Sequence, residues 1–330
     1  MKQRLLSWVA ASFVAALLGA FLGAPIGAAA QAFPSKPVTI VVPYPPGGGN
    51  DIFARAIAAG LRDVWKQSVI VDNRPGANGS IGVSYVVKAP ADGHTLLLTS
   101  SVLTIAPAID PKTPYDPVKD LAPAAFIGRG PMGLVASPKV DANTARELLA
   151  LMARKPGGLS YGSTGQGSST HLAFELIGMQ GKVQLQHVPY KGGAQVMTDL
   201  LGGHIDLYIG SLPQVMPLVR EGKVKGLAVT GTSRSPFAPG LPTLAESGLP
   251  DYEFGIWWGV YAPANTPRAV VTEINTQINK LLNTPEMTAF LGKEGATPGP
   301  TTPEKFADLV RTDSERWKAV VRDAKIQPTN

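Results

Sequence analysis

Two short segments of the chain place glycines beside polar residues in a way that could bind an anion. The first is Pro45-Pro46-Gly47-Gly48-Gly49-Asn50-Asp51, between a predicted strand and a predicted helix. Glycines let a ligand approach main-chain N–H groups, and the free N–H groups and dipole of a helix start favour negative charge. The segment therefore predicts a cradle for a carboxylate or phosphate. An ordinary strand-to-helix turn capped by Asp51 explains the same residues equally well.

The second segment also joins a predicted strand to a predicted helix. It runs Tyr161-Gly162-Ser163-Thr164-Gly165-Gln166-Gly167-Ser168-Ser169-Thr170-His171. Small hydroxyl side chains beside flexible glycines can hydrogen-bond an oxyanion without a fixed positive charge. Helix capping by Ser168 or Ser169 is the simpler alternative. Two such loops at the carboxyl edges of two sheets would line a cleft that grips both ends of a dianion.

Signatures of common enzymes are missing from the sequence. It contains no G-x-G-x-x-G, no Walker lysine motif, no G-x-S-x-G and no H-E-x-x-H, and it has no Cys. Scattered histidines favour capping or surface roles over metal ligation. These are His94, His171, His187 and His204. We therefore expect no enzyme activity, no cofactor and no metal.

A serine hydrolase is the alternative function from another class. It would use Ser163 or Ser168 as the nucleophile and His171 as the base. No third group that would orient the histidine is evident in the sequence.

Strands and helices alternate along the chain, as in parallel sheets with crossover helices. In the first unit we predict strands at 38–42, 69–71 and 95–99, a helix from 52 with Asn50 and Asp51 as its cap, and a helix at 80–87. In the second we predict a strand-like segment around Leu134, strands at 159–161, 183–188 and 205–209, and helices at 144–154, 169–179 and 194–201. Residues 233–250 read as loop, 254–261 as a strand, and 266–282 and 302–324 as helices. Neighbouring Trp257 and Trp258 would point to opposite faces of their strand, one into the core and one toward the cleft.

The composition fits a folded globular protein with many tight turns. The chain has 330 residues, 44% of them apolar and 16% charged, with 36 Gly and 30 Pro. That length suggests about two domains. The formal net charge of +6 falls to +4 without the first thirty residues, which contain Lys2 and Arg4 and no acidic residue. This mild positive balance suits capture of small anions, and no basic cluster indicates a nucleic-acid surface.

The first thirty residues have the pattern of a cleavable secretory signal peptide. Lys2 and Arg4 precede an apolar run at 5–22, and small residues at 28–32 provide a cleavage site. A membrane anchor is the alternative, because the run reaches about the lower length limit of a span. Cleavage would leave a soluble periplasmic chain without a lipid anchor, since there is no Cys to carry one.

Several stretches together match one family over nearly the whole mature chain. The sequence resembles the Bug-type periplasmic solute receptors of tripartite tricarboxylate transporters. The matching stretches are Phe33-Pro34-Ser35-Lys36-Pro37, Val42-Pro43-Tyr44-Pro45-Pro46-Gly47-Gly48, Asn73-Arg74-Pro75-Gly76, Asp92-Gly93, Tyr115-Asp116-Pro117, Tyr161-Gly162-Ser163, His187-Val188-Pro189-Tyr190-Lys191-Gly192, Asp199-Leu200-Leu201-Gly202-Gly203 and Leu241-Pro242-Thr243.

The resemblance implies an α/β, type II-like periplasmic binding fold with two lobes, each a mainly parallel sheet flanked by helices, and a ligand cleft between them. Residues 31–131 and 255–330 would form the first lobe and 132–254 the second. Closure would hinge at 128–133 and 247–255. The implied function is capture of a small dicarboxylate, tricarboxylate or aromatic carboxylate by a monomer that delivers it to the membrane permease. Presentation of the ligand to a sensor protein is an alternative that shares the same binding chemistry.

The resemblance also nominates residues that contact the ligand. They are Tyr44, Gly47, Gly48, Asp51, Ser101, Ser163, Thr164, Gly165, Ser168, His171 and Tyr190. The chain departs from the family at Ser100-Ser101-Val102-Leu103, where many members carry a Ser-Gly-Thr type run. An acidic Asp51 would repel an anion, so we expect it to cap the helix and hold the glycine loop, meeting a ligand only through water or a ligand amino or hydroxyl group.

Overall fold

A computed structural model describes residues 33–190, 192–323 and 326. It divides into a short unit, Met1–Ser35, of which only the last three residues are described, and a compact unit, Lys36–Asn330. The predicted signal peptide, residues 1–30, lies outside the described residues. No helix in the described part of the chain is both long and apolar enough to cross a bilayer.

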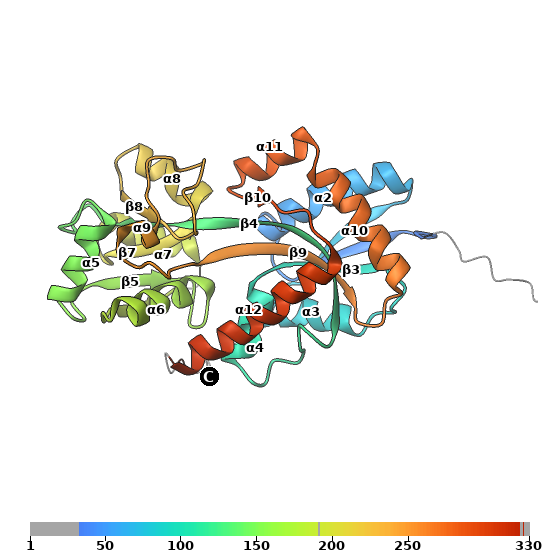
Figure 1. Cartoon of the computed structure of the whole chain (residues 1–330), viewed down its shortest axis with the longest axis horizontal. Coiled ribbons are helices and arrows are strands. Elements are labelled where there is room, and N and C mark those ends of the chain that lie inside the picture. Colours follow the sequence, from blue (N-terminus) through green and yellow to red (C-terminus); the bar gives the residue numbers. More distant parts are fainter. Residues whose placement is uncertain (1–32, 191, 324–325, 327–330) are drawn as a thin grey trace, which may run out of the picture. The chain divides into compact units, whose positions relative to one another are not determined.

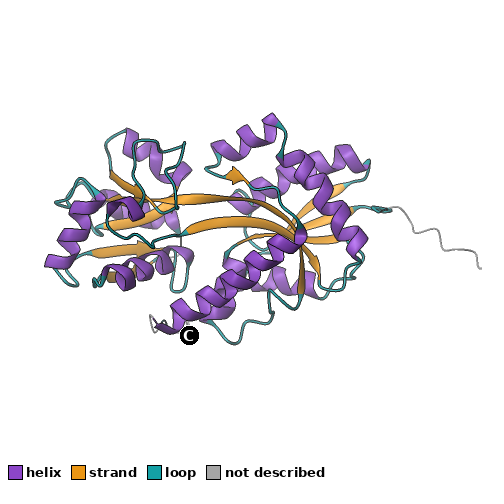
Figure 2. Ribbon diagram, in the orientation of Figure 1, coloured by secondary structure: helices purple, strands orange, loops and turns teal. Residues whose placement is uncertain are grey.

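The compact unit contains a ten-stranded sheet covered by helices (Figures 1 and 2). The strands are β1 (Val38–Val42), β2 (Val69–Asn73), β3 (Thr95–Ser100), β4 (Leu121–Ala136), β5 (Ser160–Ser163), β6 (Gln186–Pro189), β7 (Leu207–Ser211), β8 (Lys225–Val229), β9 (Gly255–Pro263) and β10 (Thr297–Pro298). The helices are α2 (Gly49–Trp65), the 3₁₀ turn η1 (Ala77–Gly79), α3 (Ser80–Val87), α4 (Val102–Ile109), α5 (Ala145–Arg154), α6 (Ser169–Gly181), α7 (Gly193–Gly202), α8 (Leu212–Arg220), α9 (Leu244–Ser247), α10 (Arg268–Leu282), α11 (Pro285–Lys293) and α12 (Pro303–Asp323).

The sheet has two halves that share the long strand β4. In the first half, β2, β1 and β3 pair in parallel, and β9 joins β3 antiparallel. In the second half, β7, β5 and β6 pair in parallel. Strand β4 pairs with β9 over Leu121–Pro131 and with β7 over Met132–Ala136, and Figure 1 shows β4 and β9 running side by side. The predicted α/β fold is confirmed, whereas the division into lobes at 131 and 254 stays a prediction.

The hydrophobic core follows the two halves and is bridged by α12. Val41, Tyr261 and Phe306 belong to a buried cluster of the first half. Trp317, two turns or more further along α12, belongs instead to a cluster that contains Tyr161 of the second half. The apolar face of α12 thus contacts both clusters, and the assignment of residues 255–330 to the first lobe stays a prediction.

Several elements differ from the sequence-based expectations, and proline explains most of the differences. Helices α4, α8 and α11 were not expected; Pro107 and Pro217 lie inside the first two, and Pro285 begins the third. The predicted loop at 233–250 contains the short α9, which a capping box of Thr243 and Glu246 begins. Proline penalises a helix only locally, so tertiary packing can still hold such segments in helical form.

Candidate functional site

The glycine loop, residues 45–49, ends β1 and starts α2. Helix α2 begins at Gly49 with Gly48 as its N-cap, and no side chain caps it. The predicted cap at Asn50 and Asp51 is therefore wrong by two to three positions, because both residues already lie within the first helical turn. Gly47 has φ +86°, the left-handed region that favours glycine. The glycine at this position is thus required by the turn itself.

Asp51 ties the glycine loop to the rest of the first half of the sheet. Its side chain is buried and accepts hydrogen bonds from Gly47 N at 2.9 Å, Arg55 Nε at 2.9 Å and Asn73 Nδ2 at 3.0 Å. Asn73 Nδ2 also lies 3.1 Å from the Tyr44 carbonyl oxygen. The Arg55 bond, with the Gly47 and Asn73 bonds, lowers the pKa of Asp51 against the opposing effect of burial. The Asp51 carboxylate therefore fixes the conformation of the glycine loop by accepting a hydrogen bond from the N–H group of Gly47.

A cavity of about 480 Å³, here called the glycine-loop cavity, adjoins this loop. Gly47 and Gly49 line it together with Ser100, Trp258 and residues 211–214 of the second half. The Trp258 ring stands edge-on to Phe53 with centroids 4.7 Å apart. Trp257 is buried, and its Nε1 donates to Asp313 Oδ2 at 3.2 Å. Trp258 thus lines the glycine-loop cavity, whereas Trp257 lines the third cavity described below.

The serine loop, residues 163–168, connects β5 to α6. Ser168 is the N-cap of α6, and its Oγ accepts from His171 N at 3.3 Å. Thr164 N donates to Thr170 Oγ1 at 2.8 Å. Gly165 and Gly167 have φ +124° and +70°, so this loop, like the glycine loop, needs glycine for its backbone path. The simpler capping role of Ser168 is realised, and Gln166 is the exposed residue of the loop.

A larger cavity of about 1060 Å³, here called the serine-loop cavity, lies between the serine loop and the first half of the sheet. Residues 164–168 line it on one side, and residues 77–81 at the start of α3 line it on the other. Its charged lining residues are Arg74, Lys88, Lys112 and Asp110, an excess of positive charge. Two helix starts and this excess suit an anion. The sequence analysis missed residues 77–81, although Asn73-Arg74-Pro75-Gly76 directly precedes them.

Tyr44 packs against the turn that precedes α3 at the serine-loop cavity. Its hydroxyl hydrogen-bonds to the side chains of Thr99 and Ser100, and burial raises its pKa to about 12. A Cβ built on Gly79 would lie 3.2 Å from this hydroxyl, so the turn before α3 rests against the tyrosine. Ala77, Asn78 and Gly79 all have positive φ, which turns the chain sharply here. Tyr44 thus positions the turn that faces the serine loop.

His171, which is buried, and His187, which is half-buried, lie behind the serine loop. The rings of His171 and His187 stack with centroids 4.0 Å apart and an interplanar angle of 8°. Gly167 N donates to His171 Nδ1 at 3.0 Å, and Ser163 Oγ lies 2.6 Å from His187 Nε2. Burial, and then the charge of His171, lowers the pKa of His187 to about 4. A surface role is wrong for His171, which is buried, but its ring accepts from the backbone just before α6, which is a capping contact. His187 is half-buried because the fold brings β6 beside β5.

The geometry does not form the serine–histidine pair of the alternative hydrolase. The Nδ1 atom of His171 accepts from Gly167, while Ser168 Oγ caps the helix. Ser163 pairs with His187 instead, but Ser163 is fully buried and His187 is a weak base with its lowered pKa. Within the described part of the chain, no group of three or more metal-ligating side chains comes together.

The remaining nominated residues make contacts within the protein. Ser101 is the buried N-cap of α4, and its N–H donates to the Trp257 carbonyl oxygen at 2.8 Å. Tyr190 donates its hydroxyl to Asp199 Oδ2 at 2.7 Å, and burial raises its pKa to about 12. The structure thus brings Thr164, Gly165 and Ser168 to one cavity and Gly47 to another. Contact of any nominated residue with a ligand stays a prediction.

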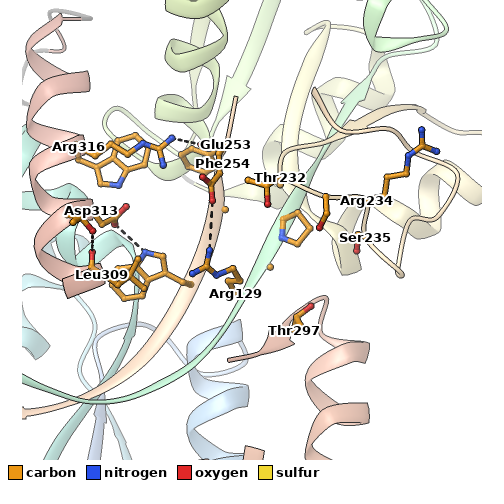
Figure 3. A pocket seen from close by; sticks show the side chains of 18 of the residues that line it. Arg129, Thr232, Arg234, Ser235, Glu253, Phe254, Thr297, Leu309, Asp313 and Arg316 are labelled. Atoms are coloured by element: carbon orange, nitrogen blue, oxygen red, sulfur yellow. Dashed lines mark hydrogen bonds and ion pairs between the residues drawn. The ribbon is translucent and has the colours of Figure 1, made fainter. Parts of the chain in front are cut away.

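A third cavity of about 520 Å³ lies on the Trp257 side of β4 and β9 (Figure 3). Its charged side chains already face groups of the protein. Arg129 Nη1 lies 3.9 Å from Glu253 Oε1, and Arg316 donates to the Glu253 carbonyl oxygen. Asp313 accepts from Thr104 Oγ1 at 2.6 Å as well as from Trp257. We therefore regard this cavity as a weaker anion site than the serine-loop cavity.

Comparison with known proteins identifies a family. Residues 53–326 match the model of the tripartite tricarboxylate transporter family receptor. The chain is 38% identical over 297 residues to a UPF0065 protein from the tcbD-tcbE intergenic region of Pseudomonas sp., covering 90% of this chain and 88% of the relative. It is 34% identical over 313 residues to BugT of Bordetella pertussis, covering 93% of this chain and 96% of the relative.

Solved structures show the same similarity. Rpa4515 of R. palustris with adipate has a TM-score of 0.80 and 36% identity, covering 90% of this chain and all of that one. MatC of Rhodopseudomonas palustris with bound malate has a TM-score of 0.75 and 31% identity, covering 88% of this chain and all of that one. Both neighbours were thus solved with a small dicarboxylate.

Proposed function

The chain belongs to the tripartite tricarboxylate transporter receptor family, and we propose that it is a periplasmic receptor that binds a small dicarboxylate in the serine-loop cavity. The observation that carries this proposal is the shared lining of that cavity. Residues 164–168 at the start of α6 and residues 77–81 at the start of α3 contribute to its walls. Helix starts carry N–H groups without intrahelical acceptors. In the serine loop those of Thr164, Gly165 and Gly167 already donate to side chains of the protein, so the loop would offer a ligand the Thr164 hydroxyl and its remaining N–H groups.

Neutral donors are well suited to hold a ligand that must later be released. Backbone N–H groups and the Thr164 hydroxyl leave no buried charge stranded when the cavity is empty. The positive side chains Lys88 and Lys112 lie at the same cavity and would attract a dianion, whereas Arg74 is already paired with Asp72 at 2.6 Å. One carboxylate would be bound by the serine loop and the other by the turn at 77–80.

The relatives support the choice of ligand class. Adipate and malate, named for the two solved neighbours, are both small dicarboxylates. Tricarboxylates and aromatic carboxylates are also within the size of a 1060 Å³ cavity. After binding, closure of the two halves about β4 and β9 would enclose the ligand, and the closed receptor would deliver it to the permease of a tripartite transporter.

A thermal-shift screen followed by titration calorimetry tests the proposal. The panel contains adipate, malate, succinate, citrate, nicotinate and terephthalate. We expect at least one to bind, and we expect Ser80→Ala and Thr164→Val, on opposite walls of the cavity, each to weaken that binding about tenfold. Ser233→Ala, which changes a hydroxyl in the third cavity, is the matched control. Binding that survives both cavity variants, or that Ser233→Ala weakens equally, would place the ligand elsewhere.

A further inference from the structure

We propose that His171 is a positioning residue that holds the serine loop in its binding conformation only while its Nδ1 is unprotonated, so that acidification weakens ligand binding. This inference rests on the proposed function, because it concerns how the serine-loop cavity binds and releases a carboxylate. His171 is 4% exposed and lies behind the loop, so it would act through the loop backbone.

The central contact joins the loop to the imidazole ring. Gly167 N donates to His171 Nδ1 across 3.0 Å, and both groups are buried. A nitrogen can accept this bond only if it carries no proton. When Nδ1 gains a proton, two N–H groups face each other and the bond is lost. Gly167, with φ +70°, lies between Gly165 and Ser168 on the cavity wall, so the loss acts directly on that wall.

A neighbouring carboxylate favours the protonated form of the same ring. His171 Nε2 lies 3.6 Å from Glu175 Oε1, one turn further along α6. Tyr161 on β5 donates its hydroxyl to the same Glu175 oxygen at 2.7 Å, which keeps the carboxylate in place. The contact between Glu175 and His171 lowers the pKa of Glu175, so the Glu175 carboxylate stays ionised. His171 is thus held between a contact that needs the neutral ring and a contact that strengthens when the ring is charged.

The remaining titratable neighbour, His187 on β6, does not compete for the proton. Its ring stacks on His171 at 4.0 Å, so charge on both rings would be repulsive. With a pKa lowered to about 4, His187 stays neutral from pH 6 to pH 8. Its Nε2, 2.6 Å from Ser163 Oγ, holds the first residue of the loop independently of His171. The titratable groups in contact with His171 are therefore Tyr161, Glu175 and His187.

Binding of adipate, or of the tightest ligand of the panel, at pH 8 and pH 6 tests the inference. Losing one hydrogen bond predicts about fivefold weaker binding of the wild type at pH 6. In His171→Asn, the Oδ1 atom can accept from Gly167 without titrating, so binding should be tight at both values. His171→Phe lacks the acceptor and should bind weakly at both. Exposed His204→Asn is the control and should keep the wild-type pH dependence.

The amide resonance of Gly167 in the ligand-free protein supplies a readout that needs no ligand. It should shift between pH 6 and pH 8 in the wild type and stay fixed in His171→Asn. A wild-type pH dependence that His171→Asn retains, or a Gly167 resonance that does not move, would overturn the inference. If the resonance behaves as expected but no carboxylate binds at pH 8, the proposed function fails instead, and with it the role in release.

Discussion

Replacing Asp51 with Ala should both destabilise the protein and weaken ligand binding. The substitution removes the acceptor of Gly47 N and Asn73 Nδ2 and half of an ion pair with Arg55. Hydrogen bonds to a charged group contribute about 1.5 to 3 kcal/mol each. The Arg55 side chain is 55% exposed, so its ion pair adds at most about 1 kcal/mol. With partial relaxation of the loop, we expect a loss of about 3 kcal/mol in the free energy of unfolding.

The effect on binding should pass through Asn73 to Tyr44. Asn73 Nδ2 lies within hydrogen-bond distance of Asp51 and of the Tyr44 carbonyl oxygen, and the Tyr44 hydroxyl lies against the turn at Gly79. Loosening this chain of contacts should reduce carboxylate affinity about tenfold, equivalent to about 1.4 kcal/mol. Urea denaturation and titration calorimetry measure the two effects.

The pH dependence of Asp51→Ala has a defined sign. Because the folded-state pKa of Asp51 is lowered, its stabilisation is present above the pKa of the unfolded chain and is lost as pH falls through the folded-state pKa. The stability gap to the variant should therefore be constant from pH 5 to 8 and shrink in stronger acid. Asp63→Ala, an exposed site on the same helix, is the control. A variant that retains full affinity and stability would refute the role given to Asp51.

Two further substitutions test the packing of α12 against the elements beside it. Gly259→Ala should lose about 1 to 3 kcal/mol of stability, because its Cβ would lie 2.1 Å from Phe306 Cζ; unchanged thermal unfolding would contradict this. Burial raises the pKa of Asp313. The contribution of Asp313 to the free energy of unfolding is therefore most favourable below its unfolded-state pKa and is lost as pH rises through its folded-state pKa. Asp313→Asn should gain stability relative to the wild type between pH 4 and pH 7 in urea denaturation, and a gap that does not change with pH would show that burial is not the dominant cause.

The regular elements were readable from sequence where local signals agree. The β-branched run at 38–42 is a buried strand, and Thr144 caps the helix that follows it, as its position before an apolar pattern predicts. Sequence fails where local rules conflict with packing. Strand β4 contains Pro123 and Pro131, and its pairing with β9 along the first part and with β7 and β8 along the second explains sixteen residues of continuous strand.

The candidate site was readable only in part. The serine loop was predicted from its glycines and hydroxyls, but the turn at 77–80 shows no chemistry-bearing side chain other than Asn78 and Ser80. The turn contributes to the proposed carboxylate site through its backbone N–H groups and its position across the cavity from the serine loop. The pairing of His171 with His187 also depends on tertiary structure, since they lie sixteen positions apart on α6 and β6. The register of β5 with β6 places His187 opposite Tyr161, whose ring stacks with both histidines.

The central claim is that the cavity recognises negative charge at both ends of a small ligand. Titration calorimetry of the tightest dicarboxylate of the panel against its neutral diamide tests it most directly, because the two differ little in shape. The account predicts one dicarboxylate bound per chain and a diamide at least about 100-fold weaker, equivalent to about 2.7 kcal/mol. Equal binding of the two compounds would contradict it.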